Sequence, residues 1–166
     1  MMFKKFFWIV CVLTALLLQG CLLTKRNQIS IPYQAVAVTG KASPTLLGQL
    51  QFDILTYINI KVAISPKDAD LILEVLDDAP NSAIASYGAT GQISAYDLND
   101  VVIFRVFDKE GRELIAPTEI FAVRAINYSP HTVLSSDMQQ AQMIEDMRKE
   151  LAMQITLRLM ALGYRK

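Results

Sequence analysis

An alternating strand that runs directly into a tight turn and a long return strand restricts the fold of this chain more than any other feature. Residues 101–107 alternate between two faces, and the even positions, which we expect to face the core, are all apolar: Val102, Phe104 and Val106. Residues 108–111, Asp-Lys-Glu-Gly, predict a tight turn, because Gly111 can adopt the left-handed conformation. Residues 112–127 then return as the partner strand, with Pro117 marking an edge or a kink. The sequence therefore predicts an antiparallel hairpin at the centre of the domain.

Two stretches with apolar residues at spacings of three and four predict helices, one before and one after this hairpin. The first starts at Ser43-Pro44, a capping residue followed by proline at the first helical position, and extends to about Tyr57. Its apolar stripe consists of Leu46, Leu47, Leu50, Ile54, Leu55 and Ile58. The second is capped by Asp137, and its buried stripe consists of Ile144, Met147, Leu151, Ile155 and Leu159. We expect its polar side to carry Glu145, Arg148, Lys149 and Arg158.

Further strands complete the predicted sheet. We expect them at residues 34–39, 61–65, 70–76 and 82–97, with a turn over 77–81 and a bulge near Gly88 or Gly91 in the last of them. The order is strand, helix, several antiparallel strands, helix. This order predicts an α+β fold: a two-layer sandwich with two amphipathic helices packed on one face of a mostly antiparallel or mixed sheet of about four strands.

The N-terminus predicts a secretion signal that ends at a cysteine. Lys4 and Lys5 precede an apolar run over residues 9–18, far shorter than the roughly 20 residues that span a bilayer. Leu18-Gln19-Gly20-Cys21 follows, and it resembles the lipobox of bacterial lipoproteins, whose peptidase cuts before a lipidated cysteine. The alternative is a plain secretory signal, or a signal-anchor, with an incidental cysteine.

The lipobox divides the chain into three parts. We expect residues 1–20 to be removed as a lipoprotein signal peptide, residues 21–32 to form a lipidated tether, and residues 33–166 to form a single α+β domain. Two or three acyl chains on Cys21 give a stable membrane anchor, where one chain binds only marginally. Leu22 follows the cysteine in place of the aspartate that is associated with inner-membrane retention. We therefore expect a lipid-anchored protein on the periplasmic side of the outer membrane.

Charge and cysteine content exclude several classes of protein. The chain has 16 basic and 16 acidic residues, and loss of Lys4 and Lys5 with the signal leaves a net charge of about −2. A general nucleic-acid binder needs a concentrated basic excess instead. Cys11 leaves with the signal and Cys21 is used for lipid attachment, so no cysteine is left for a disulfide or a thiolate metal site.

The sequence carries no recognisable catalytic or metal-binding set. His131 is the only histidine and lies in a predicted loop, without the companions of a hydrolytic triad or a zinc site. Residues 87–92 contain two glycines but lack the lysine and serine of a phosphate-binding loop. The acidic pairs at 68–70 and 77–78 lack calcium-loop spacing and are typical of solvated turns. We therefore expect no enzymatic activity, no cofactor and no metal.

The strand faces predict an interaction surface on the side of the sheet that the helices leave open. We expect Phe121, Val123 and Ala125 of the return strand to face the core, with Ile120, Ala122, Arg124 and Ile126 opposite. The candidate apolar interface then consists of Ile103, Phe107, Ile120 and Ile126. The candidate contacts to an anionic ligand or a partner are Arg105, Arg124, Lys109 and Arg112. For Lys109 and Arg112 the alternative is a solvated strand edge, paired with Glu110, Glu113 and Glu119.

Three segments carry a resemblance to a known family: residues 91–98 (Gly-Gln-Ile-Ser-Ala-Tyr-Asp-Leu), 124–128 (Arg-Ala-Ile-Asn-Tyr) and 146–152 (Asp-Met-Arg-Lys-Glu-Leu-Ala), the last continuing to Arg158-Leu159. Together with the lipobox, they resemble the lipopolysaccharide-assembly lipoprotein family LptE, also called RlpB. The resemblance implies a two-helix, four-stranded sandwich that is inserted as a plug in the β-barrel protein LptD. It also implies support of barrel assembly, binding of lipopolysaccharide and its delivery to the outer leaflet.

Two departures from the family pattern limit what can be carried over. Family members often have a glycine-aromatic-x-Leu-Arg stretch after the lipidated cysteine, whereas Cys21 is followed by Leu-Leu-Thr-Lys-Arg. Some members have basic residues where this chain has Ala89, Thr90 and Ser136, so lipopolysaccharide contacts cannot be transferred to these positions. The alternative function is an auxiliary or pilotin-like periplasmic lipoprotein of another envelope secretion or transport machine.

Overall fold

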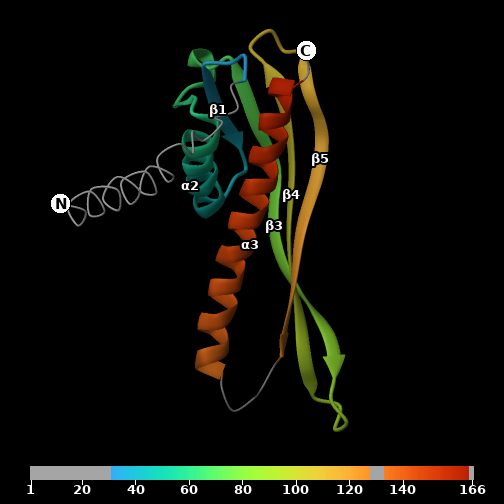
Figure 1. Ribbon diagram of the computed structural model, residues 1–166. Helices are drawn as coiled ribbons and strands as arrows, with labels where there is room; N and C mark the ends of the chain where they lie inside the picture. Colours follow the sequence, from blue (N-terminus) through green and yellow to red (C-terminus); the bar gives the residue numbers. More distant parts are fainter. Residues whose placement is uncertain (1–30, 128–132, 165–166) are drawn as a thin grey trace, which may run out of the picture.

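Two layers make up the domain, a five-stranded sheet and a pair of helices on one of its faces (Figure 1). The computed structural model describes residues 31–127 and 133–164. The strands are β1 (Ala35–Gly40), β2 (Lys61–Ala63), β3 (Leu71–Tyr87), β4 (Ile93–Asp108) and β5 (Glu113–Asn127). The helices are α2 (Pro44–Asp53), which continues as a π-helical turn (Ile54–Ile58), and α3 (Val133–Ala161), with short 3₁₀ turns at Pro66–Asp68 and Leu162–Tyr164. The predicted α+β sandwich is confirmed, with five strands where about four were expected.

The sheet is mixed, in the order β2-β1-β3-β4-β5. β1 runs parallel to both of its neighbours, and β3, β4 and β5 form an antiparallel meander. α2 connects the parallel strands β1 and β2, as a crossover between parallel strands requires. At one end of the sheet, Val36 lies beside Leu71, Leu71 beside Asp108, and Phe107 beside Glu113. The start of the domain and the β4–β5 turn therefore share that end.

The predicted cap of the first helix is confirmed. Ser43 has an extended backbone, and its Oγ accepts a hydrogen bond from the Leu46 N–H at 3.3 Å, with Pro44 in the first turn. The π-helical turn ends at Asn59, whose φ of 59° gives the left-handed conformation that commonly terminates helices. The stripe of the first helix is confirmed at Leu46, Leu50 and Ile54, which are fully buried, and at Ile58. The assignment of Leu55 to this stripe is wrong, because that side chain is 54% exposed.

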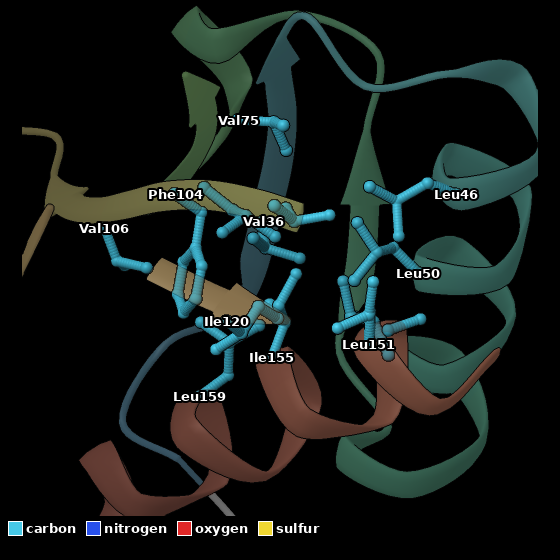
Figure 2. Close-up of a cluster of buried hydrophobic side chains, with 14 of the residues drawn as sticks. Val36, Leu46, Leu50, Val75, Phe104, Val106, Ile120, Leu151, Ile155 and Leu159 are labelled. Atoms are coloured by element: carbon cyan, nitrogen blue, oxygen red, sulfur yellow. The ribbon is translucent and has the colours of Figure 1, made fainter. Parts of the chain in front are cut away.

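The second helix begins earlier than predicted. It starts at Val133, four residues before Asp137, so the predicted cap is wrong. Its stripe is confirmed: Met147, Leu151, Ile155 and Leu159 are fully buried and Ile144 is partly buried. These side chains pack on the apolar faces of β3, β4 and β5 and against α2 (Figure 2). Among the described residues, no helix is both long and apolar enough to cross a membrane.

Two strand predictions are wrong in their bounds. β3 continues through the expected turn at 77–81 to Tyr87, and the expected single strand over 82–97 divides between β3 and β4. The reversal lies at Gly88–Gln92, where the Gly88 N–H donates to the Gln92 carbonyl at 2.7 Å. The far ends of β3 and β4 form an arm, residues 80–97, that projects past the start of α3 (Figure 1). Every residue from 81 to 92 is exposed, because no helix covers this part of the ribbon.

Candidate functional site

One face of the sheet carries no helix, and we call it the open face. It consists of the alternate residues Ile72, Glu74, Val101, Ile103, Arg105, Phe107, Phe121 and Val123. Phe121 and Val123 of the edge strand β5 are 62% and 43% exposed, while Ile103 and Phe107 of β4 are partly buried. Apolar side chains exposed together on a sheet are typical of an interaction surface. The open face is therefore the first candidate functional site.

The predicted orientation of β5 is wrong, and the sheet register explains why. Val102, which is fully buried under the helices, lies directly opposite Ile120, so the even residues of both strands share the helix-covered face. Ile120 and Ile126 are consequently buried at 3% and 8% exposure, and they are core residues instead of interface residues. The bulk of Phe121 had indicated a core position, but this residue points to the open face.

Arg105 is the predicted cation that does lie on the open face. Its Nε donates to Glu74 Oε2 of the neighbouring strand at 2.6 Å, and its Nη2 lies equally close to the same oxygen. The guanidinium also lies 5.6 Å from the ring centroid of Phe107. A cation over an aromatic ring is stabilised by the ring quadrupole. Arg105 is thus held flat against the open face, with 41% of its side chain exposed.

Arg124 lies on the other face. It is directly opposite Leu98, a buried residue, and its Nη2 donates to Glu150 Oε2 of α3 at 2.5 Å. The expectation that Arg105 and Arg124 share the open face is therefore wrong. Arg124 instead links the edge strand to the helix layer through a pair in which both side chains are nearly half exposed.

Lys109 and Arg112 lie at the turn between β4 and β5. Neither pairs with the expected partners Glu110, Glu113 and Glu119. Lys109 Nζ lies 3.6 Å from Asp70 Oδ1, and Arg112 donates from Nε to Asp108 Oδ2 at 2.9 Å. A hydrogen bond from the Gln34 N–H is the main cause that holds the pKa of Asp70 below its usual value, and Lys109 adds to the effect. Both cationic side chains are largely exposed, at 60% and 74%.

A buried ion cluster was not predicted. Arg148 of α3 is only 6% exposed and donates to both carboxylate oxygens of Asp78, at 3.0 and 3.2 Å. Its Nε lies 3.4 Å from Asp100 Oδ2, and burial raises the pKa of Asp100, opposed by the charge of Arg148. Asp78 Oδ2 also accepts the Ser43 N–H at 2.7 Å, so the cluster ties the start of α2 to β3. The expectation that Arg148 lies on the polar side of its helix is therefore wrong, although Arg148 does stand at helical spacing with Ile144 and Leu151.

The described residues hold no group of three or more metal-ligating side chains. Ala89 and Thr90 lie exposed at the tip of the arm. The predicted lipidation site Cys21, residues 22–30 of the expected tether and the loop residue His131 lie outside the described residues. The geometry therefore offers surfaces and ion pairs, and the chemistry it supports is binding.

Comparison with known proteins gives a family and a fold. The family model LptE, described as lipopolysaccharide-assembly, matches residues 27–159. No curated protein matches the chain. Among solved structures, an uncharacterized lipoprotein B from Nitrosomonas europaea is 23% identical with a TM-score of 0.75, and the match covers 84% of this chain and 91% of that one.

Two further structures have the same fold. The minor lipoprotein from Acinetobacter baumannii is 23% identical, with a TM-score of 0.66 over 79% of this chain and 93% of that one. The rare lipoprotein B from Shewanella oneidensis is 22% identical, with a TM-score of 0.62 over 76% and 93%. The family match covers most of the sequence, and it includes every strand and nearly all of α3. The chain therefore belongs to the LptE family, and it is a non-enzymatic lipopolysaccharide-assembly lipoprotein of the cell envelope.

Proposed function

We propose that this protein is an outer-membrane lipoprotein that pairs with and plugs the LptD β-barrel. In this role it supports assembly of the barrel and insertion of lipopolysaccharide into the outer leaflet. Family membership supports the proposal, as does the lipobox that ends at Cys21. Leu22 after that cysteine favours the outer membrane as the address.

The observation that carries the proposal is the uncovered sheet face. A two-layer domain normally buries apolar strand faces, yet Phe121 and Val123 are exposed on the open face, which also carries Ile103 and Phe107. Burial of apolar side chains releases about 25 cal/mol per Å², so this surface favours contact with a protein wall. We propose that Ile103, Phe107, Phe121 and Val123 contact the barrel interior, since Ile120 and Ile126 belong to the core.

Arginine and lysine side chains provide the proposed contacts to the phosphates of lipopolysaccharide. Arg105, Lys109, Arg112 and Arg124 all have exposed charged groups, and each is paired with a carboxylate. A phosphate that binds here replaces the carboxylate of a weak surface ion pair. At the arginines it gains charge-assisted hydrogen bonds from both arms of the guanidinium fork. Such contacts screen the phosphates from one another and disfavour self-aggregation of the lipid.

The partner is tested by pull-down of the tagged full-length chain from detergent-solubilised outer membranes, with mass spectrometry of the captured proteins. We expect recovery of an LptD-like barrel in equal amount. Phe121→Glu, which places a charge on the open face, is expected to abolish this recovery. Phe52→Glu is the matched control, because Phe52 is 59% exposed on α2, on the helix side.

The outcomes test the identity of the partner and the role of the open face separately. Recovery of a secretin or a transporter in place of the barrel contradicts the proposed function and favours the alternative envelope machine. Recovery of the barrel by Phe121→Glu retains the function and excludes the open face as the contact. Charge reversal at Arg105 or Arg124 is expected to weaken lipopolysaccharide binding in the folded protein, whereas Lys149→Glu leaves it unchanged.

A further inference from the structure

A pocket of about 520 Å³ lies between the start of β5 and the last turns of α3. Figure 1 shows these two segments side by side at the end of the molecule that is opposite the arm. The strand register shows why there is a gap here, because β5 bulges twice. Phe104 lies opposite Thr118, Val106 opposite Ile115 and Phe107 opposite Glu113, so the edge strand has two extra residues over this stretch. A bulge bends the strand that contains it, and here it opens a gap beside the helix. The volume is within the range of small-molecule sites.

The lining of this pocket combines apolar walls with two opposite charges. Leu114, Ile115 and Leu162 provide partly buried apolar surface. Arg158 and Glu113 provide the charges, and no ion pair joins these two described side chains. A site with separated opposite charges is complementary to a zwitterion, since a single anion would meet the repulsion of Glu113.

Arg158 differs from the other arginines in the described part of the chain. Arg105, Arg112, Arg124 and Arg148 each pair with a carboxylate there. Within the same ranges, Arg158 donates one hydrogen bond, from Nη1 to the Gln154 carbonyl at 3.2 Å, and no described carboxylate lies within ion-pair distance. The fork of its guanidinium is thus available to a phosphate. The carbonyl groups at the end of α3 add negative potential, which further disfavours a purely anionic ligand.

The position of the pocket indicates where its ligand comes from. The strand register places Glu113 at the same end of the sheet as Val36, three strands away, or about 14 Å. The chain enters the domain at this end from the predicted lipid-bearing Cys21, which precedes Ile31 by ten residues. Ten residues span at most about 35 Å. The pocket is therefore tethered close to a bilayer surface when the cysteine is acylated.

We propose that this pocket binds the headgroup of a zwitterionic phospholipid. The phosphate is held by Arg158, the ammonium lies near Glu113, and the start of an acyl chain runs along Leu114, Ile115 and Leu162. The site would fix how the domain sits on its own membrane. This proposal rests on the proposed lipidation of Cys21, which gives the pocket access to the bilayer. It does not depend on pairing with a barrel.

The test uses the full acylated chain in a neutral detergent, with methyl groups of leucine and isoleucine labelled for nuclear magnetic resonance. Dihexanoyl phosphatidylethanolamine is the probe, and dihexanoyl phosphatidylglycerol is its anionic counterpart. We expect the first lipid to shift the methyl signals of Leu114, Ile115 and Leu162, and to bind about tenfold more tightly than the second, as one charged contact implies. Phosphoethanolamine without acyl chains is expected to bind more weakly than the lipid, and equal binding would contradict the role of the apolar wall.

Two substitutions and two matched controls identify the contacts. Arg158→Gln and Glu113→Gln are each expected to weaken binding of the phosphatidylethanolamine about tenfold. Glu113→Gln alone should also remove the preference over phosphatidylglycerol, because it removes the repulsion of the anion. Lys149→Gln on α3 and Glu119→Gln on β5 remove the same charges outside the pocket, and they should leave binding within about twofold.

The result that overturns the site is equally specific. Signals of core methyl groups, such as those of Leu151, report whether each variant is folded. Folded Arg158→Gln protein that binds both lipids as the unchanged chain does would exclude the pocket. Shifts that are confined to the open face would exclude it as well. If the Phe121→Glu protein loses barrel pairing but still binds phosphatidylethanolamine, the pocket and the proposed barrel contact are independent sites.

Discussion

The two faces of the sheet use the same residue types for opposite purposes. On the helix-covered side, apolar side chains such as Leu73 are fully buried, and Arg148 of α3 is enclosed with two aspartates of the sheet. On the open face, apolar side chains such as Phe121 remain exposed, and Arg105 pairs with a single glutamate in contact with solvent. Neighbouring residues of one strand thus differ in what they contribute, according to the face on which they lie.

Stability and binding therefore depend on different side chains of this molecule. A charge that is enclosed under the helices, as Arg148 is, has lost its hydration, so its partners must remain in place. A charge on the open face keeps most of its hydration, and it can exchange one partner for another at little cost. We therefore expect substitutions on the covered face to change the free energy of unfolding, and those on the open face to change binding.

The largest effect is expected from Arg148→Met, which removes the cation from the buried cluster. Asp78 and Asp100 would be left as buried carboxylates without a counter-charge, and breaking such a pair typically costs about 3–5 kcal/mol. Urea denaturation followed by circular dichroism measures the loss. A combined variant that also carries Asp78→Asn and Asp100→Asn should recover part of it, and failure to recover would show that the charges were not the cause.

The next largest effect contrasts two adjacent residues of β3. Leu73 is fully buried on the covered face, and its neighbour Ile72 is partly buried on the open face. Leu73→Ala should lower the free energy of unfolding by about 3 kcal/mol, through lost burial and the cavity that is left. Ile72→Ala should cost about 1 kcal/mol, because part of that side chain is already in water. Equal losses would mean that the open face is covered in the free protein.

The sequence predicted the covered face better than the open face, for a physical reason. The alternation over residues 101–107 and the stripe from Met147 to Leu159 each place apolar side chains on one face only, so the period identifies the buried side. In β5 both faces carry apolar residues, and its orientation is set by pairing with β4, which no local pattern contains. Ile120 and Ile126 were assigned to the wrong face on that account.

The cluster around Arg148 could be predicted only in part. Arg148 was assigned to the polar side of its helix, because a buried charge is stable only with partners, and these come from strands that are distant in sequence. Asp78 and Asp100 resemble ordinary turn residues until the register of β3 and β4 brings them under α3. The start of α3 at Val133 was missed because Asp137 offered a more obvious cap.

A smaller effect on the covered face is the pH dependence that Asp100 confers. Burial raises the pKa of Asp100 in the folded state above its unfolded value, so folding favours the protonated form. Its stabilising contribution is full below the unfolded pKa and is lost as the pH rises through the folded pKa. Asp100→Asn should remove this part of the pH dependence and raise stability near pH 7 by about 1 kcal/mol. Denaturation curves recorded between about pH 3 and pH 7, the range in which aspartates titrate, measure this pH dependence of stability.

The smallest effect is expected from the pair on the open face. Glu74→Gln removes the carboxylate that accepts from Arg105, yet both side chains keep substantial contact with water, so the free energy of unfolding should fall by less than about 1 kcal/mol. Added salt should narrow even this difference, because it screens exposed charges. The same variant frees the Arg105 guanidinium, and we expect it to bind lipopolysaccharide more tightly. A loss of several kcal/mol would instead show that the two faces are equally important for stability, whereas tighter binding at nearly unchanged stability would assign this face to recognition.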